Sequence, residues 1–253
     1  MLRLLLPSFL EGCSREPPPR PSQPTVLVNA DRAGPVVAVG SIEQKWRIGS
    51  WAPASITLDL QQGDTILVTG AYWADLEARA TVAPTDDRGQ LKPVIEQAAA
   101  VVGRNKPPVF AHLYVELNAS AGRHVITPPY LGGPAGDGTM YVLQLRGVSK
   151  VVSSGQSRLV KMNLDRIGTA LEAKAASNDV VIAFAGYDNT EGRPEPGWIQ
   201  PAGWTELATQ NDSQTNVPST LSMRMGTDDL AAVEWSWADP NVNVAAAVVV
   251  ALR

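Results

Sequence analysis

The residues able to carry out acid–base or nucleophilic chemistry are few in this chain. His112 and His124 are the only histidines, and each lies inside an alternating apolar stretch. A Ser-His-Asp arrangement needs a histidine within hydrogen-bond reach of a nucleophile and of an orienting carboxylate. No Gly-x-Ser-x-Gly motif marks such a nucleophile in the sequence. We therefore expect both histidines to be structural or surface residues, and we expect no catalytic site.

Adjacent carboxylates occur at Asp86-Asp87 and at Asp228-Asp229. Two carboxylates that face each other across a cleft can hydrolyse glycosidic bonds, so a β-sandwich hydrolase is one alternative. Both pairs lie in turn-like sequence, where Asp accepts hydrogen bonds from nearby backbone N–H groups. We expect turn capping at both pairs, with no metal site and no cofactor, and calcium binding in these acidic loops as the remaining alternative.

The seven tryptophans include four in the second half of the chain. Trp235 and Trp237 share one face of an alternating strand, which predicts a place in the core or in an interface. Trp198 and Trp204 lie in a Pro/Gly-rich stretch, where an indole ring can contact a partner protein or stack on a sugar. These two residues are the candidates for an interface or a ligand-stacking surface.

Composition limits the classes of partner. The net charge of -4 gives no electrostatic footprint for nucleic acid or anionic membrane. No stretch approaches the roughly 20 apolar residues of a membrane-spanning helix. Leu10 to Cys13 stands where a lipoprotein signal would end, but Pro7 interrupts the apolar run, so we expect no lipid anchor. Cys13 is the one cysteine, either a harmless thiol or half of an interchain disulfide.

Residues 1–35 are expected to form an extended arm. Five prolines fall in the eight positions from Pro17 to Pro24, which favours a polyproline-type conformation without internal hydrogen bonds. Such an arm can lie as a strap on another subunit. The residues expected to make this contact are Leu4, Leu5, Leu6, Phe9, Pro17, Pro18 and Pro19.

The chain runs through one β-rich pattern twice. Residues 56–72 align without a gap on residues 171–187, and in both copies an Asp-containing turn precedes an apolar run that reaches a Gly and a Tyr. Each copy ends on an apolar strand, at residues 140–146 and 245–253. The sequence predicts an all-β protein with two tandem antiparallel β-sandwich modules, jelly-roll or Ig-like, at 36–148 and 149–253.

Short apolar runs separated by Gly, Pro, Asn or Asp mark the expected strands. Residues 221–225 and 233–237 alternate most cleanly and predict half-buried antiparallel strands. A strand is also expected at 170–175, because this segment aligns with the alternating residues 56–60. Residues 94–102 fit a short helix as well as a strand, and periodicity does not choose between them.

One motif resembles a known family. Pro201-Ala-Gly-Trp-Thr205 is similar to a Pro-x-Gly-Trp-Thr signature of β-sandwich modules in tailed-bacteriophage virion proteins, and the resemblance covers residues 178–253. It implies a non-enzymatic virion component, such as a capsid decoration protein, a head fibre or spike base, or a tail accessory protein. The implied partners are other virion proteins and further copies of the chain, without nucleic acid or membrane. The alternative is a secreted or surface protein that binds carbohydrate, such as a host-surface glycan.

Overall fold

The computed structural model describes residues 25–27, 37–45, 55–74, 83–100, 109–127, 136–187, 197–210, 217–237 and 242–253. This part of the chain is built from strands in several antiparallel sheets. It contains no helix with the length and apolarity needed to span a membrane. The predicted N-terminal arm lies outside the described residues, apart from 25–27, and so do its interface candidates: Leu4, Leu5, Leu6, Phe9, Pro17, Pro18 and Pro19.

The first half of the chain forms a six-stranded and a three-stranded sheet. The six-stranded sheet has the order β1-β2-β9-β4-β7-β6, and the three-stranded sheet has the order β3-β8-β5. The strands are β1 (Thr25–Leu27), β2 (Val37–Lys45), β3 (Ile56–Leu60), β4 (Thr65–Ala74), β5 (Thr85–Asp86), β6 (Lys92–Ala100), β7 (Val109–Glu116), β8 (Gly122–Thr127) and β9 (Gly136–Leu145).

The second half forms a five-stranded and a two-stranded sheet. The five-stranded sheet has the order β10-β16-β12-β14-β13, and β11 pairs with β15 in the two-stranded sheet. The strands are β10 (Val151–Leu164), β11 (Arg166–Thr169), β12 (Val180–Tyr187), β13 (Thr205–Gln210), β14 (Ser219–Met225), β15 (Val233–Ser236) and β16 (Val242–Leu252).

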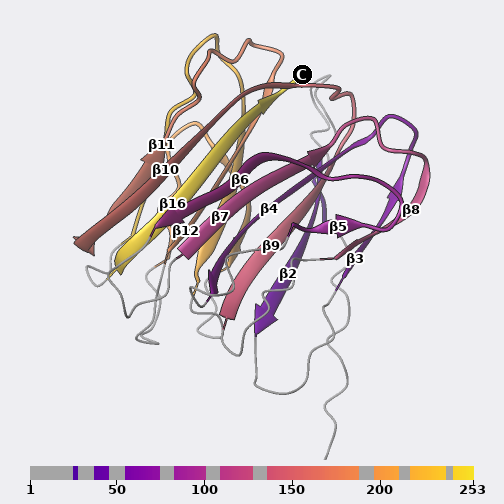
Figure 1. Cartoon of the computed structure of the whole chain (residues 1–253). Helices are drawn as coiled ribbons and strands as arrows, with labels where there is room; N and C mark the ends of the chain where they lie inside the picture. Colours follow the sequence, from indigo (N-terminus) through magenta and orange to yellow (C-terminus); the bar gives the residue numbers. More distant parts are fainter. Residues whose placement is uncertain are drawn as a thin grey trace, which may run out of the picture.

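The sheets stack in four layers, and each contact between layers is an apolar cluster. One cluster joins the six-stranded to the five-stranded sheet, and its members include Leu143 of β9 and Phe184 of β12. A second joins the five-stranded to the two-stranded sheet around Trp235. A third joins the six-stranded to the three-stranded sheet around Leu58. The two large sheets therefore lie at the centre, with one small sheet outside each of them (Figure 1).

This stacking explains why the central strands are apolar throughout. All eight residues of β12 are buried. In β16, Val248 faces the six-stranded sheet while its neighbour Val249 faces the two-stranded sheet. A strand covered on both faces has no solvent side on which to place polar residues, so its sequence does not alternate. A sheet with one solvated face would show alternation instead.

The two large sheets share one arrangement of strands. β4 lies between β9 and β7, and β12 lies between β16 and β14. The register agrees as well: Thr65 of β4 pairs with Leu145, while Val180 of β12 pairs with Leu252. Thr65 and Val180 are also equivalent in the ungapped sequence alignment. Equivalent residues of the repeat thus occupy equivalent positions in their ladders.

Each copy of the repeat buries one aspartate at the turn before its central strand. Asp64 accepts a hydrogen bond from Arg146 Nε at 3.1 Å, and Asp179 accepts hydrogen bonds from Arg253 Nε at 2.6 Å and Nη2 at 2.9 Å. Each also caps its turn, through the backbone N–H of Gln61 or Ala176. Burial raises both carboxyl pKa values, but the hydrogen bonds and the arginine charge outweigh it and hold each pKa below its usual range.

We expect Asp179→Asn to remove an acid-dependent part of the stability. The folded-state pKa of Asp179 is lowered, so its contribution is present above the unfolded-state pKa of about 3.9 and is lost as the pH falls through the folded value. At neutral pH the loss of charge-assisted bonds should cost roughly 2 kcal/mol. Urea unfolding at pH 7 and pH 3 tests this, with the exposed Asp228→Asn as control. An equal loss for both variants would contradict the prediction.

One expected strand does not form, and one segment that the sequence left open is a strand. Residues 170–175 do not form the predicted strand, since Leu171 N–H donates to Leu230, Glu172 N–H to Ser154 and Ala175 N–H to Asp229. Because these partners belong to different segments, no continuous ladder forms, and only an isolated bridge joins Ala175 to Asp229. The ambiguous segment that starts at Val94 is a strand as far as Ala100, within β6.

Candidate functional site

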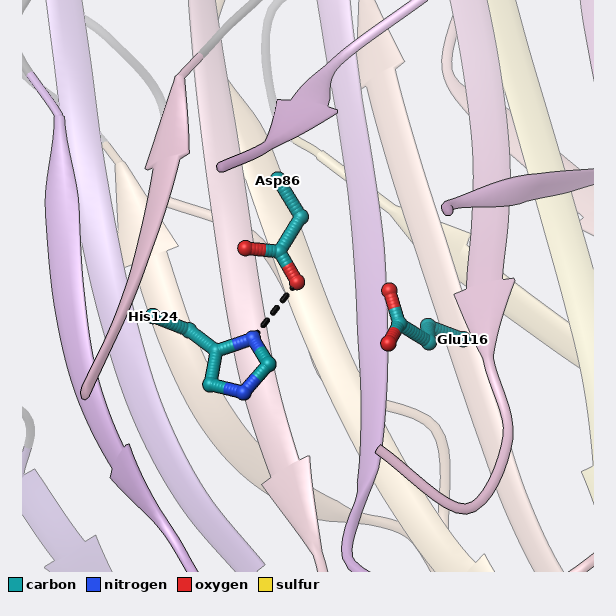
Figure 2. Close-up of side chains that lie close together, drawn as sticks. All are labelled: Asp86, Glu116 and His124. Atoms are coloured by element: carbon teal, nitrogen blue, oxygen red, sulfur yellow. Dashed lines mark hydrogen bonds and ion pairs between the residues drawn. The ribbon is translucent and has the colours of Figure 1, made fainter. Parts of the chain in front are cut away.

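Three metal-ligating or titratable side chains converge where the three-stranded sheet meets the end of β7. Asp86 belongs to β5, His124 to β8, and Glu116 is the last residue of β7. β5 and β8 are paired, with Asp86 opposite Ile126, which places Asp86 and His124 close together. Figure 2 shows the Asp86 carboxylate directed at the imidazole ring, with the Glu116 carboxylate facing them from the other side.

The three groups are close and largely shielded from solvent. His124 Nδ1 lies 2.6 Å from Asp86 Oδ2, and neither side chain is exposed. One donor atom from each of the three residues lies within 4.8 Å of the other two. In the described part of the chain, Glu116 Oε2 is buried and accepts no hydrogen bond. Burial raises the pKa of Glu116, and the neighbouring Asp86 charge raises it further.

The second nitrogen of the His124 ring lies beside Ser120. His124 Nε2 lies 3.0 Å from the carbonyl oxygen of Ser120, which can only accept a hydrogen bond. A proton on Nε2 is donated to this carbonyl, and a proton on Nδ1 is donated to Asp86 Oδ2. Ser120 Oγ lies 3.3 Å from the same nitrogen and completes a Ser-His-Asp sequence of contacts.

The sequence located two of the three residues and missed their association. Asp86 was expected to cap a turn, and Arg88 N–H does donate to its Oδ1 at 3.2 Å, but Oδ2 faces His124. Glu116 drew no attention, because a single Glu at the end of an apolar strand carries no motif. Asp86 and His124 are 38 positions apart in the sequence, and the pairing of β5 with β8 brings them together.

The role of this cluster is argued from its geometry and chemistry alone. No family model, curated protein or solved structure matches this chain. The donor set, the distances and the burial are therefore the basis on which a role for Asp86, Glu116 and His124 is argued.

Trp198 lies inside the protein rather than on an open surface. It is 8% exposed, and its ring centroid lies 4.9 Å from that of Tyr187 and 5.3 Å from that of Trp237. Trp235 is also fully buried and donates its indole N–H to Ser222 Oγ. These aromatic side chains belong to the cluster between the five-stranded and two-stranded sheets. A partner or sugar would have access to little of the Trp198 ring.

Trp204 is partly exposed and belongs to the Pro-x-Gly-Trp-Thr motif. Trp204 N–H donates to the Pro201 carbonyl at 3.2 Å, and Gly203 between them has φ of +79°. A positive φ at the third residue of such a turn favours glycine, which accounts for the Gly of the motif. The turn leads into β13 and places the Trp204 ring under Arg224, whose guanidinium lies 5.2 Å from the ring centroid. The motif therefore has a structural role: it forms the turn that leads into β13, at the edge of the five-stranded sheet.

The opposite edge of this sheet is formed by β10. This strand of 14 residues pairs only with β16 within the described sheets. Leu159 is 37% exposed and Val160 is 49% exposed. Neighbouring residues of a strand point to opposite faces, so β10 presents apolar side chains on both faces at this point of the sheet edge.

Proposed function

We propose that this protein is a non-enzymatic structural component of a tailed-bacteriophage virion that acts through protein–protein interfaces. The observation that carries the proposal is the edge strand β10, which pairs only with β16 among the described strands and exposes Leu159 and Val160. Natural sheets usually protect long apolar edges, and an edge left open can pair with another chain. Further copies of this chain and other virion proteins are the proposed partners. The Pro201-Ala-Gly-Trp-Thr205 resemblance supports the virion as the location.

We further propose that each half is a β-sandwich module, at residues 36–148 and 149–253. The shared strand order of the two large sheets and the equivalent Asp64 and Asp179 turns support this division. Each module then pairs one large sheet with one small sheet, and the two modules pack through their large sheets. The extended arm at 1–35 would add a second contact with a neighbouring subunit.

We expect Val160→Lys to weaken self-association of the purified chain at least about tenfold. A charge placed at the centre of an apolar interface must be desolvated, and truncating such an anchor commonly costs about 2 kcal/mol. Sedimentation equilibrium measures the effect. Leu230→Lys is the matched control, because Leu230 is 48% exposed and lies outside the strands. A chain that is monomeric before substitution, or an equal effect of both variants, would refute the β10 interface.

The location is tested separately. Antibodies against the purified chain, with immunogold electron microscopy of tailed particles from the source culture, should label the particles. A stable monomer that binds a polysaccharide, and is absent from every particle, would instead support the carbohydrate-binding alternative. Trp204 would then be the residue to test first, because its ring is more accessible than that of Trp198.

A further inference from the structure

The cluster of Asp86, Glu116 and His124 gathers electron-pair donors around one point. His124 Nδ1 faces Asp86 Oδ2 at 2.6 Å, while Nε2 lies 3.0 Å from the Ser120 carbonyl oxygen. Two lone pairs at this distance repel each other unless a positive charge lies between them. Glu116 adds a third donor within 4.8 Å of the others. A proton fits between Nδ1 and Oδ2 at this distance, and a metal cation that contacts all three donors would replace it.

The orientation of His124 matches that of a metal ligand. Histidines that bind metal through one nitrogen usually donate the other N–H to a backbone carbonyl or a carboxylate, which fixes the tautomer and the ring. The Ser120 carbonyl plays this part for His124. Both the imidazole and the Asp86 side chain are fully shielded from solvent, so water does not screen the charges there.

In the second half of the chain, the residue equivalent to Glu116 is an arginine, and an aspartate of the protein neutralises its charge. Glu116 pairs with Ile66 of β4, and the residue that pairs with the equivalent Val181 of β12 is Arg224. Arg224 binds both oxygens of Asp229, at 2.8 and 2.6 Å. In the first half a carboxylate replaces this arginine, so two acids meet with one histidine.

The surroundings also leave space for the Glu116 carboxylate. Gly89 lies against it so closely that a Cβ at this position would overlap the carboxyl group. A side chain at residue 89 would therefore push Glu116 away from Asp86 and His124. The backbone of the β5–β6 connection and the end of β7 are in this way fitted to each other around the charged cluster.

We propose that Asp86, Glu116 and His124 bind one zinc ion, which joins the three-stranded sheet to the end of β7. One imidazole nitrogen with two carboxylate oxygens is a donor set that zinc accepts in proteins, whereas calcium prefers oxygen donors alone. Ligands of a tetrahedral zinc ion lie about 3.3 Å apart, so zinc binding would move the Asp86 carboxylate away from Nδ1 and bring the Glu116 carboxylate closer. The sequence predicted no metal site, since no motif links these three positions.

The test uses the full chain, stripped of metal with a chelator and then titrated with zinc chloride by calorimetry. One zinc ion per chain is expected, with an unfolding temperature that rises with zinc concentration. Glu116→Gln keeps the size of the side chain and removes a ligand charge, so zinc affinity should fall at least about tenfold. Gly89→Ala should weaken zinc binding by displacing Glu116 without removing a donor. Glu206→Gln, on the exposed part of β13, is the control and should bind as the unaltered chain does.

X-ray absorption at the zinc edge should show one nitrogen and two oxygen ligands from the protein, and Glu116→Gln should change this shell. The metal-free Glu116→Gln variant should remain folded, because the substitution removes a repulsion between carboxylates. Three results would overturn the inference: no zinc bound by the unaltered chain, equal affinity in Glu116→Gln and Glu206→Gln, or a response to calcium and none to zinc. The first two would leave protons as the charges that hold the cluster together, and the third would assign the cluster to calcium.

Discussion

Acidification from pH 7 to pH 4 is expected to destabilise this protein through His112, and His112→Leu is expected to remove that loss. His112 lies on β7 and is 2% exposed. Burial lowers the pKa of His112 to about 4, because the charged ring would lose its hydration. Its Nε2 has no hydrogen-bond partner within the described residues, so no acceptor there stabilises a second proton.

The direction of the pH effect follows from the pKa values of His112 in the unfolded and in the folded chain. In the unfolded chain His112 takes up a proton near pH 6.5, whereas in the folded chain it stays neutral until about pH 4. The unfolded state therefore binds more protons in this window, and stability is present above pH 6.5 and falls as the pH drops towards 4. A difference of about 2.5 pH units corresponds to roughly 3 kcal/mol. The window lies above the range in which Asp179 loses its contribution.

Urea unfolding at intervals between pH 7.5 and pH 4 measures the effect. The ring centroids of Tyr72 and Tyr114 lie 5.5 Å from that of His112, and both phenols are neutral throughout this range. The variant retains every other titrating group, so the difference in slope between the two proteins isolates His112. An unchanged slope in His112→Leu would mean that the histidine is already protonated, or solvated, in the folded protein.

The sequence was sufficient for the local structure because strand patterns are local. Alternation in residues 221–225 and the Asp-containing turns before β4 and β12 both identify elements that the structure contains. Residues 170–175 are the exception. Their sequence pattern fits a strand, but their backbone N–H groups donate to different segments, so no neighbouring strand pairs with them. Strand formation requires a neighbour, and a single sequence does not reveal which neighbours the fold supplies.

Sequence patterns could not predict the stacking of the sheets or the charged cluster for the same reason. The apolar run of β12 shows that both its faces are covered, without showing that the six-stranded sheet covers one of them. Asp86 and His124 each have an ordinary local explanation, and only the sheet geometry brings them within 2.6 Å. The burial of Trp198 likewise depends on the packing of the two-stranded sheet against the five-stranded sheet.

Phe184→Ala is expected to lower the stability of the whole chain in a single transition. Phe184 is fully buried between the two large sheets, and its ring centroid lies 5.8 Å from that of Tyr141 of β9. Removing a buried phenylalanine side chain from a packed core costs about 3–5 kcal/mol. Because this cluster draws its residues from both halves, neither half can keep its large sheet covered once the other unfolds.

Differential scanning calorimetry distinguishes this from two independent domains. We expect one transition in the unaltered chain, with a calorimetric enthalpy equal to the van't Hoff enthalpy. Phe184→Ala should move this transition as a whole, and so should Leu58→Ala, which alters only the cluster between the six-stranded and three-stranded sheets. If the halves were independent, Phe184→Ala and Leu58→Ala would each shift a different one of two peaks. A single peak that responds to both substitutions would show that the face-to-face contact of the large sheets makes the two halves one cooperative unit.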